Sequence, residues 1–401
     1  MNLAQLYKSK KVLVIIDQAI ISGSSFVLSY IAALKLEKFE FGAFMLLITL
    51  SNYLFTFHAS LVTQPYQINL SKINKSMLIK AGNVLTILIF TIFCIGFFLY
   101  IYLKPSYDIF LIINYLLFAG FYIFHEFIRR IEQSNGNYSR LIIFDGIAYG
   151  MRIIGVLLVS TFYLNDNFVA WVLFISNLTY MLSIFYFKWK DKKLTHGNGK
   201  IKLNSLLEEG KWIIGSTFVF FLSSQLYIFI IATFNSLEDV AIISAVLLPV
   251  GLLRPISIGA EGYIVPNVNK IEKKHQWYGF IKESSFFYIP IILISLILIL
   301  FPKPIIDFFF NDKYTESSIY LCLAAINSLI SITIYFISFY LRIIFENNNL
   351  FKINVLSLIL TFPWGVWLIA NNGVEAYFFV LISNNLIILS LSILLVRKNR
   401  V

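Results

Sequence analysis

Two arginines within long apolar stretches are the residues of this chain best suited to binding chemistry. Arg152 lies near the middle of the stretch Leu141–Leu164. Arg254 lies within Val240–Val265 and is followed by Pro255, which is expected to free a backbone carbonyl and bend the helix. A charge inside an apolar helix is costly, and a guanidinium binds phosphate oxygens through two parallel hydrogen bonds. We therefore expect both arginines to bind an anionic substrate such as a phosphate.

A structural role for the two arginines is the alternative. Arg152 follows Asp145 by two turns of a helix, so the two side chains would share one face and form an ion pair. Arg254 would pair in the same way with a carboxylate of a neighbouring helix. Both the functional and the structural interpretation stay open.

A second set of polar residues lies near one end of the apolar stretches, the end that adjoins the loops rich in Lys and Arg. The set comprises Asp17, Gln18, His58, Gln64, His125, Glu126, Asp145 and Glu261. Such residues either line the mouth of a pathway or extend to water at the membrane surface, and for His125 and Glu126 the second interpretation is favoured.

From these residues we select two groups of candidates. The candidates for substrate binding are Arg152, Arg254, Asp17, Gln18 and Gln64. The candidates for carrying a proton or sodium ion are Asp17, Glu126, Asp145 and Glu261. Asp17 is followed by a polar stripe of Gln18, Ser22, Ser25 and Ser29 at spacings of four, three and four, so this face of the first helix is expected to face protein or a cavity rather than lipid.

The elements that must position these residues are membrane-spanning helices. The chain of 401 residues is 59% hydrophobic and 13% charged, with a mean hydropathy of +0.79, which excludes a soluble fold. Scanning for runs long enough to cross a bilayer predicts an all-α integral membrane protein with about 12 transmembrane helices. The last two predicted spans are Asn354–Ala370, interrupted by Pro363, and Ala376–Val396.

The distribution of Lys and Arg predicts the orientation. Most of the 32 basic residues fall in alternate loops and at both termini, which places both termini in the cytoplasm. The net charge of +11 is explained by this bias, so it is no evidence for binding nucleic acid.

A repeated pentapeptide predicts two similar halves. Gly23–Val27 opens the first apolar stretch and Gly215–Val219 opens the seventh. We expect an N-terminal six-helix bundle over 1–187, a basic cytoplasmic linker over 188–210 and a C-terminal six-helix bundle over 211–401, related as parallel, pseudo-symmetric repeats. The pentapeptides themselves are interpreted as elements of close helix packing.

The sequence contains no nucleotide-binding loop, metal-ligand cluster or hydrolase motif, so we expect no enzymatic activity, no cofactor and no bound metal. Cys94 and Cys322 lie inside predicted spans and indicate no disulfide. Transport energy would then come from an ion gradient or from the gradient of the substrate.

The first sixth of the chain resembles bacterial polysaccharide transporters. The residues that carry the resemblance are Asp17–Gly23, Phe26, Glu40–Gly42 and Leu61–Pro65. These proteins are O-antigen and lipid-linked oligosaccharide flippases of the multidrug/oligosaccharidyl-lipid/polysaccharide (MOP) superfamily, so the resemblance implies a fold like that of multidrug and toxic compound extrusion (MATE) transporters.

The resemblance also implies a function. An undecaprenyl-diphosphate-linked oligosaccharide, such as a repeat unit of O-antigen (lipopolysaccharide), capsule or exopolysaccharide, would be turned across the bacterial cytoplasmic (inner) membrane by alternating access. Its candidate partners are a polysaccharide polymerase and a chain-length regulator. In this family positive residues often lie in the cavity, and Arg152 and Arg254 match them in character.

Two alternatives remain. A cation-coupled multidrug exporter of the same fold would need carboxylates in a largely neutral cavity, whereas the charges near mid-depth are arginines. A membrane enzyme such as a polysaccharide polymerase or an acyltransferase is less well supported, because the external loops are short and no histidine has an evident set of catalytic partners.

Overall fold

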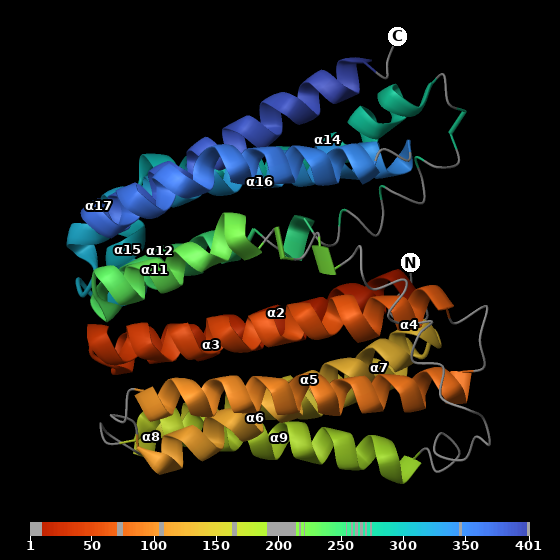
Figure 1. Cartoon of the computed structure of the whole chain (residues 1–401), viewed down its shortest axis with the longest axis vertical. Helices are drawn as coiled ribbons and strands as arrows, with labels where there is room; N and C mark the ends of the chain where they lie inside the picture. Colours follow the sequence, from red (N-terminus) through yellow and green to blue (C-terminus); the bar gives the residue numbers. More distant parts are fainter. Residues whose placement is uncertain are drawn as a thin grey trace. The chain divides into compact units, whose positions relative to one another are not determined.

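The described part of the chain is built from helices (Figure 1). The computed structural model describes residues 10–69, 75–103, 108–162, 167–190, 221–253, 275–344 and 347–398, together with single positions and short stretches between 214 and 272. Within these residues no strand occurs, and nine helices are long and apolar enough to cross a membrane. The prediction of an all-α membrane protein is thereby confirmed, whereas the exact number of 12 spans is not.

The contacts divide the chain into two compact units. Unit 1 comprises Met1–Leu36 and Leu47–Phe218, and unit 2 comprises Glu37–Leu46 and Val219–Val401. The predicted linker over 188–210 falls almost wholly outside the described residues.

Unit 1 contains the elements that carry most of the candidate residues. They are α2 (Lys10–Lys35), α3 (Lys38–His58, whose first turns belong to unit 2), the π-helical η1 (Ala59–Thr63), α4 (Gln64–Asn69), α5 (Lys75–Leu103), α6 (Ile109–Ser134), α7 (Tyr138–Asp145), the π-helical η2 (Gly146–Gly150), α8 (Met151–Phe162) and α9 (Phe168–Lys190).

Within unit 1, α6 packs against α9, and α2 packs against α7 and α8. Aromatic residues fill much of the interior, where Tyr115, Phe118, Tyr149 and Tyr180 belong to one buried cluster. Helix α5, by contrast, exposes a continuous apolar face that includes Ile92, which is 61% exposed. An exposed face of this kind is stable in hydrocarbon and is what a lipid-facing helix requires.

Unit 2 contains η4 (Phe221–Gln225), α11 (Leu226–Phe234), α12 (Leu237–Gly251), α14 (Gln276–Leu300), α15 (Pro302–Phe310), η6 (Thr315–Ser317), α16 (Ser318–Ile343) and α17 (Asn347–Lys398). The start of α12 has a local cause in the sequence, because the Ser236 hydroxyl accepts a hydrogen bond from the Asp239 amide at 3.0 Å.

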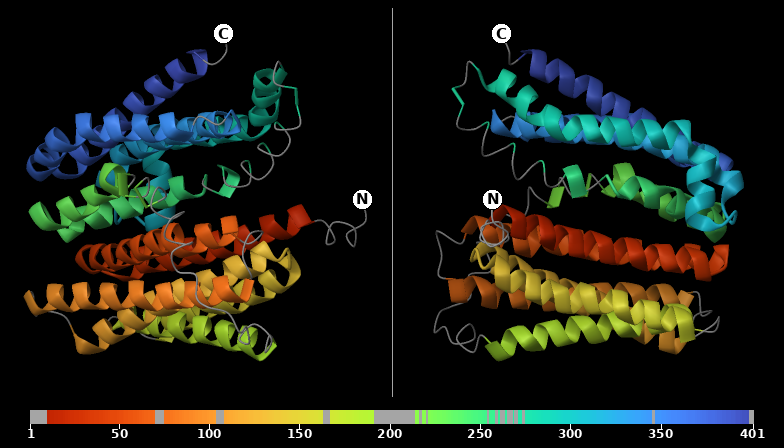
Figure 2. Two further views of the ribbon diagram at one scale, coloured as in Figure 1. Left: turned by 45° about the vertical axis from the view of Figure 1, so that its right-hand side comes forward. Right: turned by 180° about the vertical axis from the view of Figure 1, so that it is seen from behind.

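Helix α17 comprises the last two predicted spans, Asn354–Ala370 and Ala376–Val396. Gly373 has a φ of 59°, a conformation that glycine adopts at little cost, and it bends the chain between the two arms. The lighter and darker blue arms meet at this bend in Figure 2, and α17 is the main packing partner of α16.

The interpretation of the repeated pentapeptide as a close-packing element stays a prediction. A Cβ built at Gly23 or at Gly215 would meet no described atom within 4 Å, so no close packing is seen at either glycine within the described residues. Ser216 and Thr217 of the second copy lie outside the described residues. In the first copy, Ser24 rather than the glycine makes the specific contacts described below.

Candidate functional site

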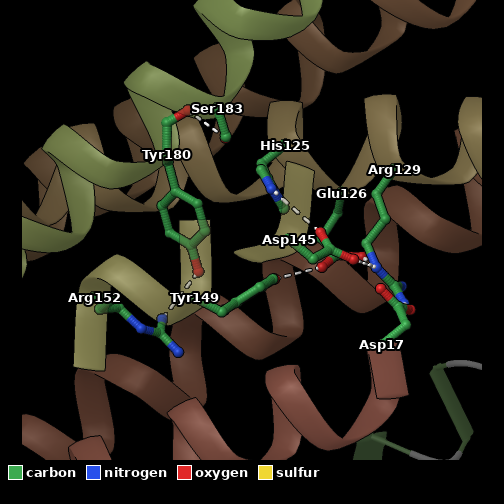
Figure 3. A network of polar contacts seen from close by, with 9 residues as sticks. All are labelled: Asp17, His125, Glu126, Arg129, Asp145, Tyr149, Arg152, Tyr180 and Ser183. Atoms are coloured by element: carbon green, nitrogen blue, oxygen red, sulfur yellow. Dashed lines mark hydrogen bonds and ion pairs between the residues drawn. The ribbon is translucent and has the colours of Figure 1, made fainter. Parts of the chain in front are cut away.

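A buried network of charged residues lies inside unit 1 (Figure 3). Its centre is Arg129 of α6, whose Nη2 donates to Oδ2 of Asp17 on α2 at 2.5 Å. The Nε of the same guanidinium donates to Oδ2 of Asp145, at the end of α7, at 2.8 Å. One arginine therefore joins three helices that are separate in the sequence. Charge-assisted bonds of this kind are the strong ones in a protein interior.

A third carboxylate belongs to the same network. Oε2 of Glu126 lies 3.6 Å from Nη1 of Arg129, one turn away on α6. Its Oε1 accepts a hydrogen bond from the hydroxyl of Tyr149 at 2.7 Å. Because Tyr149 lies in η2, this contact ties the π turn to the carboxylates.

His125 is enclosed among aromatic rings beside the carboxylates. Its ring stacks on Phe144 with a centroid distance of 4.3 Å and meets the ring of Tyr180 at 5.0 Å. Its Nε2 lies 3.5 Å from Oδ1 of Asp145, and neither ring nitrogen has a hydrogen-bond partner among the described residues. The expectation that His125 and Glu126 extend to water at the membrane surface is wrong, because both side chains are buried.

Arg152 on α8 is also buried, but it does not pair with Asp145 as the structural alternative proposed. Its Nε donates to the Ser24 hydroxyl at 3.0 Å, and its Nη1 donates to the Tyr180 hydroxyl at 3.0 Å. The guanidinium also lies over the ring of Tyr149, 5.0 Å from the centroid. Its Nη2 has no hydrogen-bond partner among the described residues.

The π turn explains why the predicted pair does not form. Residues seven positions apart share one face of a regular α-helix, because a turn contains 3.6 residues. In η2 the amide of Met151 bonds to the carbonyl of Gly146, five residues earlier, so this turn contains more residues. Asp145 and Arg152 are therefore rotated away from a common face.

The network contains one further charged group that makes no direct ion pair among the described residues. The carboxyl groups of Asp17, Glu126 and Asp145 and the guanidinium groups of Arg129 and Arg152 are buried. The half-buried Arg130 lies next to Arg129 on α6 and attracts Asp17 and Glu126 electrostatically, so with the histidine neutral the formal charges balance. Oδ1 of Asp17 and Oδ1 of Asp145 have no hydrogen-bond partner among the described atoms. These two buried oxygens are the unoccupied acceptors of the network.

The structure thus brings together Asp17, Glu126, Asp145 and, at its edge, Arg152. Gln18 is half-buried and Gln64 is exposed, and neither is among the residues of this network. The two remaining candidates, Arg254 and Glu261, lie outside the described residues.

Sequence reasoning missed Arg129, because it counted this residue among the Lys and Arg of the loops between spans. Helix α6 continues to Ser134. A signal was present in the spacing of His125, Arg129 and Glu132, which follow one another by four and three residues and so share one helical face.

Among the described residues of unit 2, the buried polar side chains are uncharged. The amide of Asn384 accepts hydrogen bonds from Ser357 at 2.6 Å and from Thr361 at 3.1 Å. The neighbouring Asn385 donates to Asn327 and to Ser331, each at 2.8 Å. These amides join α16 and the two arms of α17.

Comparison with known structures finds the same fold in MATE transporters. An inward-facing multidrug resistance MATE family transporter of the MOP superfamily superposes with a TM-score of 0.67 at 11% identity, covering 98% of this chain and 94% of that one. An outward-facing structure of such a transporter gives 0.61 at 12% identity, with 97% and 94% covered. A mutant of the Vibrio cholerae MATE transporter VcmN gives 0.65 at 15% identity, with 99% and 96% covered.

Neither the family models nor the curated proteins include a match to this sequence. The chain is a multi-pass membrane protein by its apolar helices. More particularly, it has the MATE transporter fold, as the sequence predicted.

Proposed function

We propose that this chain is a membrane transporter that works by alternating access and is driven by a cation bound at the network around Arg129. The fold supports the first part, because the similar structures include both an inward-facing and an outward-facing state. The single observation that carries the second part is the pair of buried carboxylate oxygens, Oδ1 of Asp17 and Oδ1 of Asp145, that have no hydrogen-bond partner among the described atoms.

A proton suits this site better than a sodium ion. Arg129 already occupies one oxygen of Asp17 and one of Asp145, and its positive charge lies between the two carboxylates. A sodium ion needs several oxygen ligands and would be repelled by the guanidinium, whereas a proton needs one free carboxylate oxygen. Proton binding removes one negative charge from the carboxylates, and proton release restores it.

For the substrate we propose a lipid-linked oligosaccharide carrying a diphosphate. The support is the resemblance of the first sixth of the chain to polysaccharide transporters, together with the chemistry of Arg152. This guanidinium keeps one donor, Nη2, for an anionic group, while its other contacts hold it in place. A polysaccharide polymerase would then use the product at the outer leaflet of the bacterial inner membrane.

A cation-coupled multidrug exporter is the second candidate. The observation that favours it is the cluster of three buried carboxylates, because the sequence argument against an exporter was that its internal charges were arginines. The name of one similar structure, a multidrug resistance transporter, agrees with this candidate.

Transport by purified protein in lipid vesicles tests both candidates. The substrates are a fluorescent undecaprenyl-diphosphate oligosaccharide, whose leaflet is read with a membrane-impermeant quencher, and the lipophilic cation ethidium. Wild type is expected to move the glycolipid when a pH gradient is imposed, and Asp145→Asn is expected to lose this dependence. Glu238→Gln, at an exposed position of α12, is the matched control and is expected to behave as wild type.

Movement of ethidium but not of the glycolipid would replace the first candidate by the second. A sodium gradient that drives transport at constant pH would refute the proton. Movement of neither substrate by well-folded protein under any imposed gradient would refute the proposed function.

A further inference from the structure

The π turn η2 (Gly146–Gly150) interrupts the helix that carries Asp145 and Arg152. Turns of this kind are rare in proteins, cost hydrogen-bond geometry and occur often at functional sites. Here the turn lies between α7, which supplies a carboxylate to Arg129, and α8, which supplies the second guanidinium. Any change in its winding therefore changes the geometry of the charged network.

The glycines at the two ends of η2 are not required by packing. A Cβ at Gly146 or at Gly150 would meet no described atom within 4 Å. Gly155, one turn further along α8, is different, because its Cβ would lie 2.5 Å from Cγ2 of Ile175. Glycine weakens a helix relative to alanine. The two open glycines thus make rewinding easier without serving a close contact.

Tyr149 connects the winding of η2 to the network through three contacts. Its hydroxyl donates to Glu126 at 2.7 Å, and its ring lies under the guanidinium of Arg152. Its backbone carbonyl accepts a hydrogen bond from Ser24 at 2.9 Å, and the same hydroxyl of Ser24 accepts from Arg152. These contacts stabilise the π form and keep Arg152 away from Asp145.

The balance of charge depends on the form of the turn. Arg129 is in direct contact with the carboxylates, whereas Arg152 contacts only hydroxyls and rings among the described residues. In a regular α-helix Arg152 would return to the face of Asp145. A carboxylate that has lost its proton would then gain a second guanidinium, and Coulomb attraction in a buried site would favour this α form.

We propose that η2 is a hinge that senses the charge of the network. The turn is π-helical while the carboxylates hold a proton, and it rewinds to α-helix when the proton leaves, which rotates α8 and draws Arg152 toward Asp145. This inference rests on the proposed proton coupling and adds to it the element that moves. Tyr149 is a positioning residue in this device, because it acts through Arg152 and Glu126.

Replacement of the glycines by alanine tests the hinge. Gly146→Ala and Gly150→Ala each narrow the range of backbone torsion angles and so disfavour departures from regular α geometry, and the double variant is expected to hold the turn in the α form. The matched control is Gly96→Ala, at an exposed position of α5 that is also free of described neighbours within 4 Å. It makes the same substitution in a helix without changing η2.

The readout is a distance across the turn that does not require transport. Ile143 on α7 and Ile154 on α8 are 49% and 61% exposed, so both accept a spin label after replacement by cysteine in a chain whose two native cysteines are removed. In lipid nanodiscs, the label-to-label distance is measured by pulsed electron paramagnetic resonance at low and high pH.

Wild type and Gly96→Ala are expected to change this distance between the two pH values. The double variant is expected to keep the high-pH distance at both, and Tyr149→Phe to reach the high-pH distance at a lower pH. A double variant with the same pH response as wild type, or a wild-type distance independent of pH, would overturn the hinge.

The vesicle assay separates this result from the proposed function. If the distance is constant while transport remains driven by a pH gradient, the hinge fails and the coupling stands. If the distance follows pH in wild type and not in the double variant, while no substrate is moved, the hinge stands and the proposed transport fails.

Discussion

Replacing Arg129 is expected to destabilise unit 1 more than any other single change of a charged residue in the network. The variant Arg129→Gln removes the guanidinium that holds Asp17 at 2.5 Å and Asp145 at 2.8 Å. Three buried carboxyl groups are then left with the guanidinium groups of Arg152 and of the half-buried Arg130. Glutamine is also shorter than arginine, so a second variant is needed to separate the effect of charge from that of packing.

The size of the effect follows from burial. Breaking a buried ion pair by removing one partner costs about 3–5 kcal/mol, because the other charge stays uncompensated. Proton uptake by the remaining carboxylates limits this loss, so we expect a value near the lower end, about 3 kcal/mol. This corresponds to a decrease of about 160-fold in the ratio of folded to unfolded protein.

Arg397, at an exposed position in the last turn of α17, provides a matched control. Arg397→Gln is expected to cost less than about 1 kcal/mol, as is usual for charges at the surface. Unfolding of both variants is measured in mixed micelles with increasing dodecyl sulfate, followed by circular dichroism.

A second variant separates charge from packing. In the double variant Asp17→Asn, Arg129→Gln one carboxylate is removed together with the guanidinium, so the loss is expected to be smaller than in Arg129→Gln alone. Equal stability of the Arg129→Gln and Arg397→Gln proteins would refute the buried network. A double variant less stable than Arg129→Gln would refute its electrostatic explanation.

Two further predictions concern packing and the neutral half. Gly82→Ala places a Cβ 2.3 Å from Cζ of Phe127, so it is expected to destabilise the protein by about 1–3 kcal/mol, and wild-type stability in the same unfolding assay would contradict this close approach. In unit 2, Asn384→Leu removes the acceptor for Ser357 and Thr361, and we expect a loss of about 0.6–1.7 kcal/mol that does not change with pH between 5 and 8. A strong pH dependence of that loss would show that a charged group takes part.

The fold could be predicted from the sequence, because composition and the length of the apolar runs leave few possibilities. The buried network could be predicted only in part. Asp17, Glu126 and Asp145 were selected as carriers because a carboxylate inside an apolar stretch needs a reason, and the structure places all three around one guanidinium. That they bind a proton stays a prediction.

Two features were beyond the sequence argument for physical reasons. Positive residues at a helix end are indistinguishable from a cytoplasmic loop by charge alone, so Arg129 was counted outside the membrane. The predicted pair of Arg152 with Asp145 assumed a constant 3.6-residue period, and the π turn between them breaks that period. The opposing residues of other helices, such as Ser24 and Tyr180, decided the position of Arg152.

The position of Arg129 in the chain has a consequence for biosynthesis. Its first partner, Asp17, precedes it by 112 residues, and its second, Asp145, follows it by 16. During synthesis α6 therefore leaves the ribosome before Asp145, so its charged end lacks one of three carboxylate partners and is costly to bury in hydrocarbon. We expect the first helices to stay beside the insertion machinery until α7 arrives, so that they enter the membrane as a group rather than one by one.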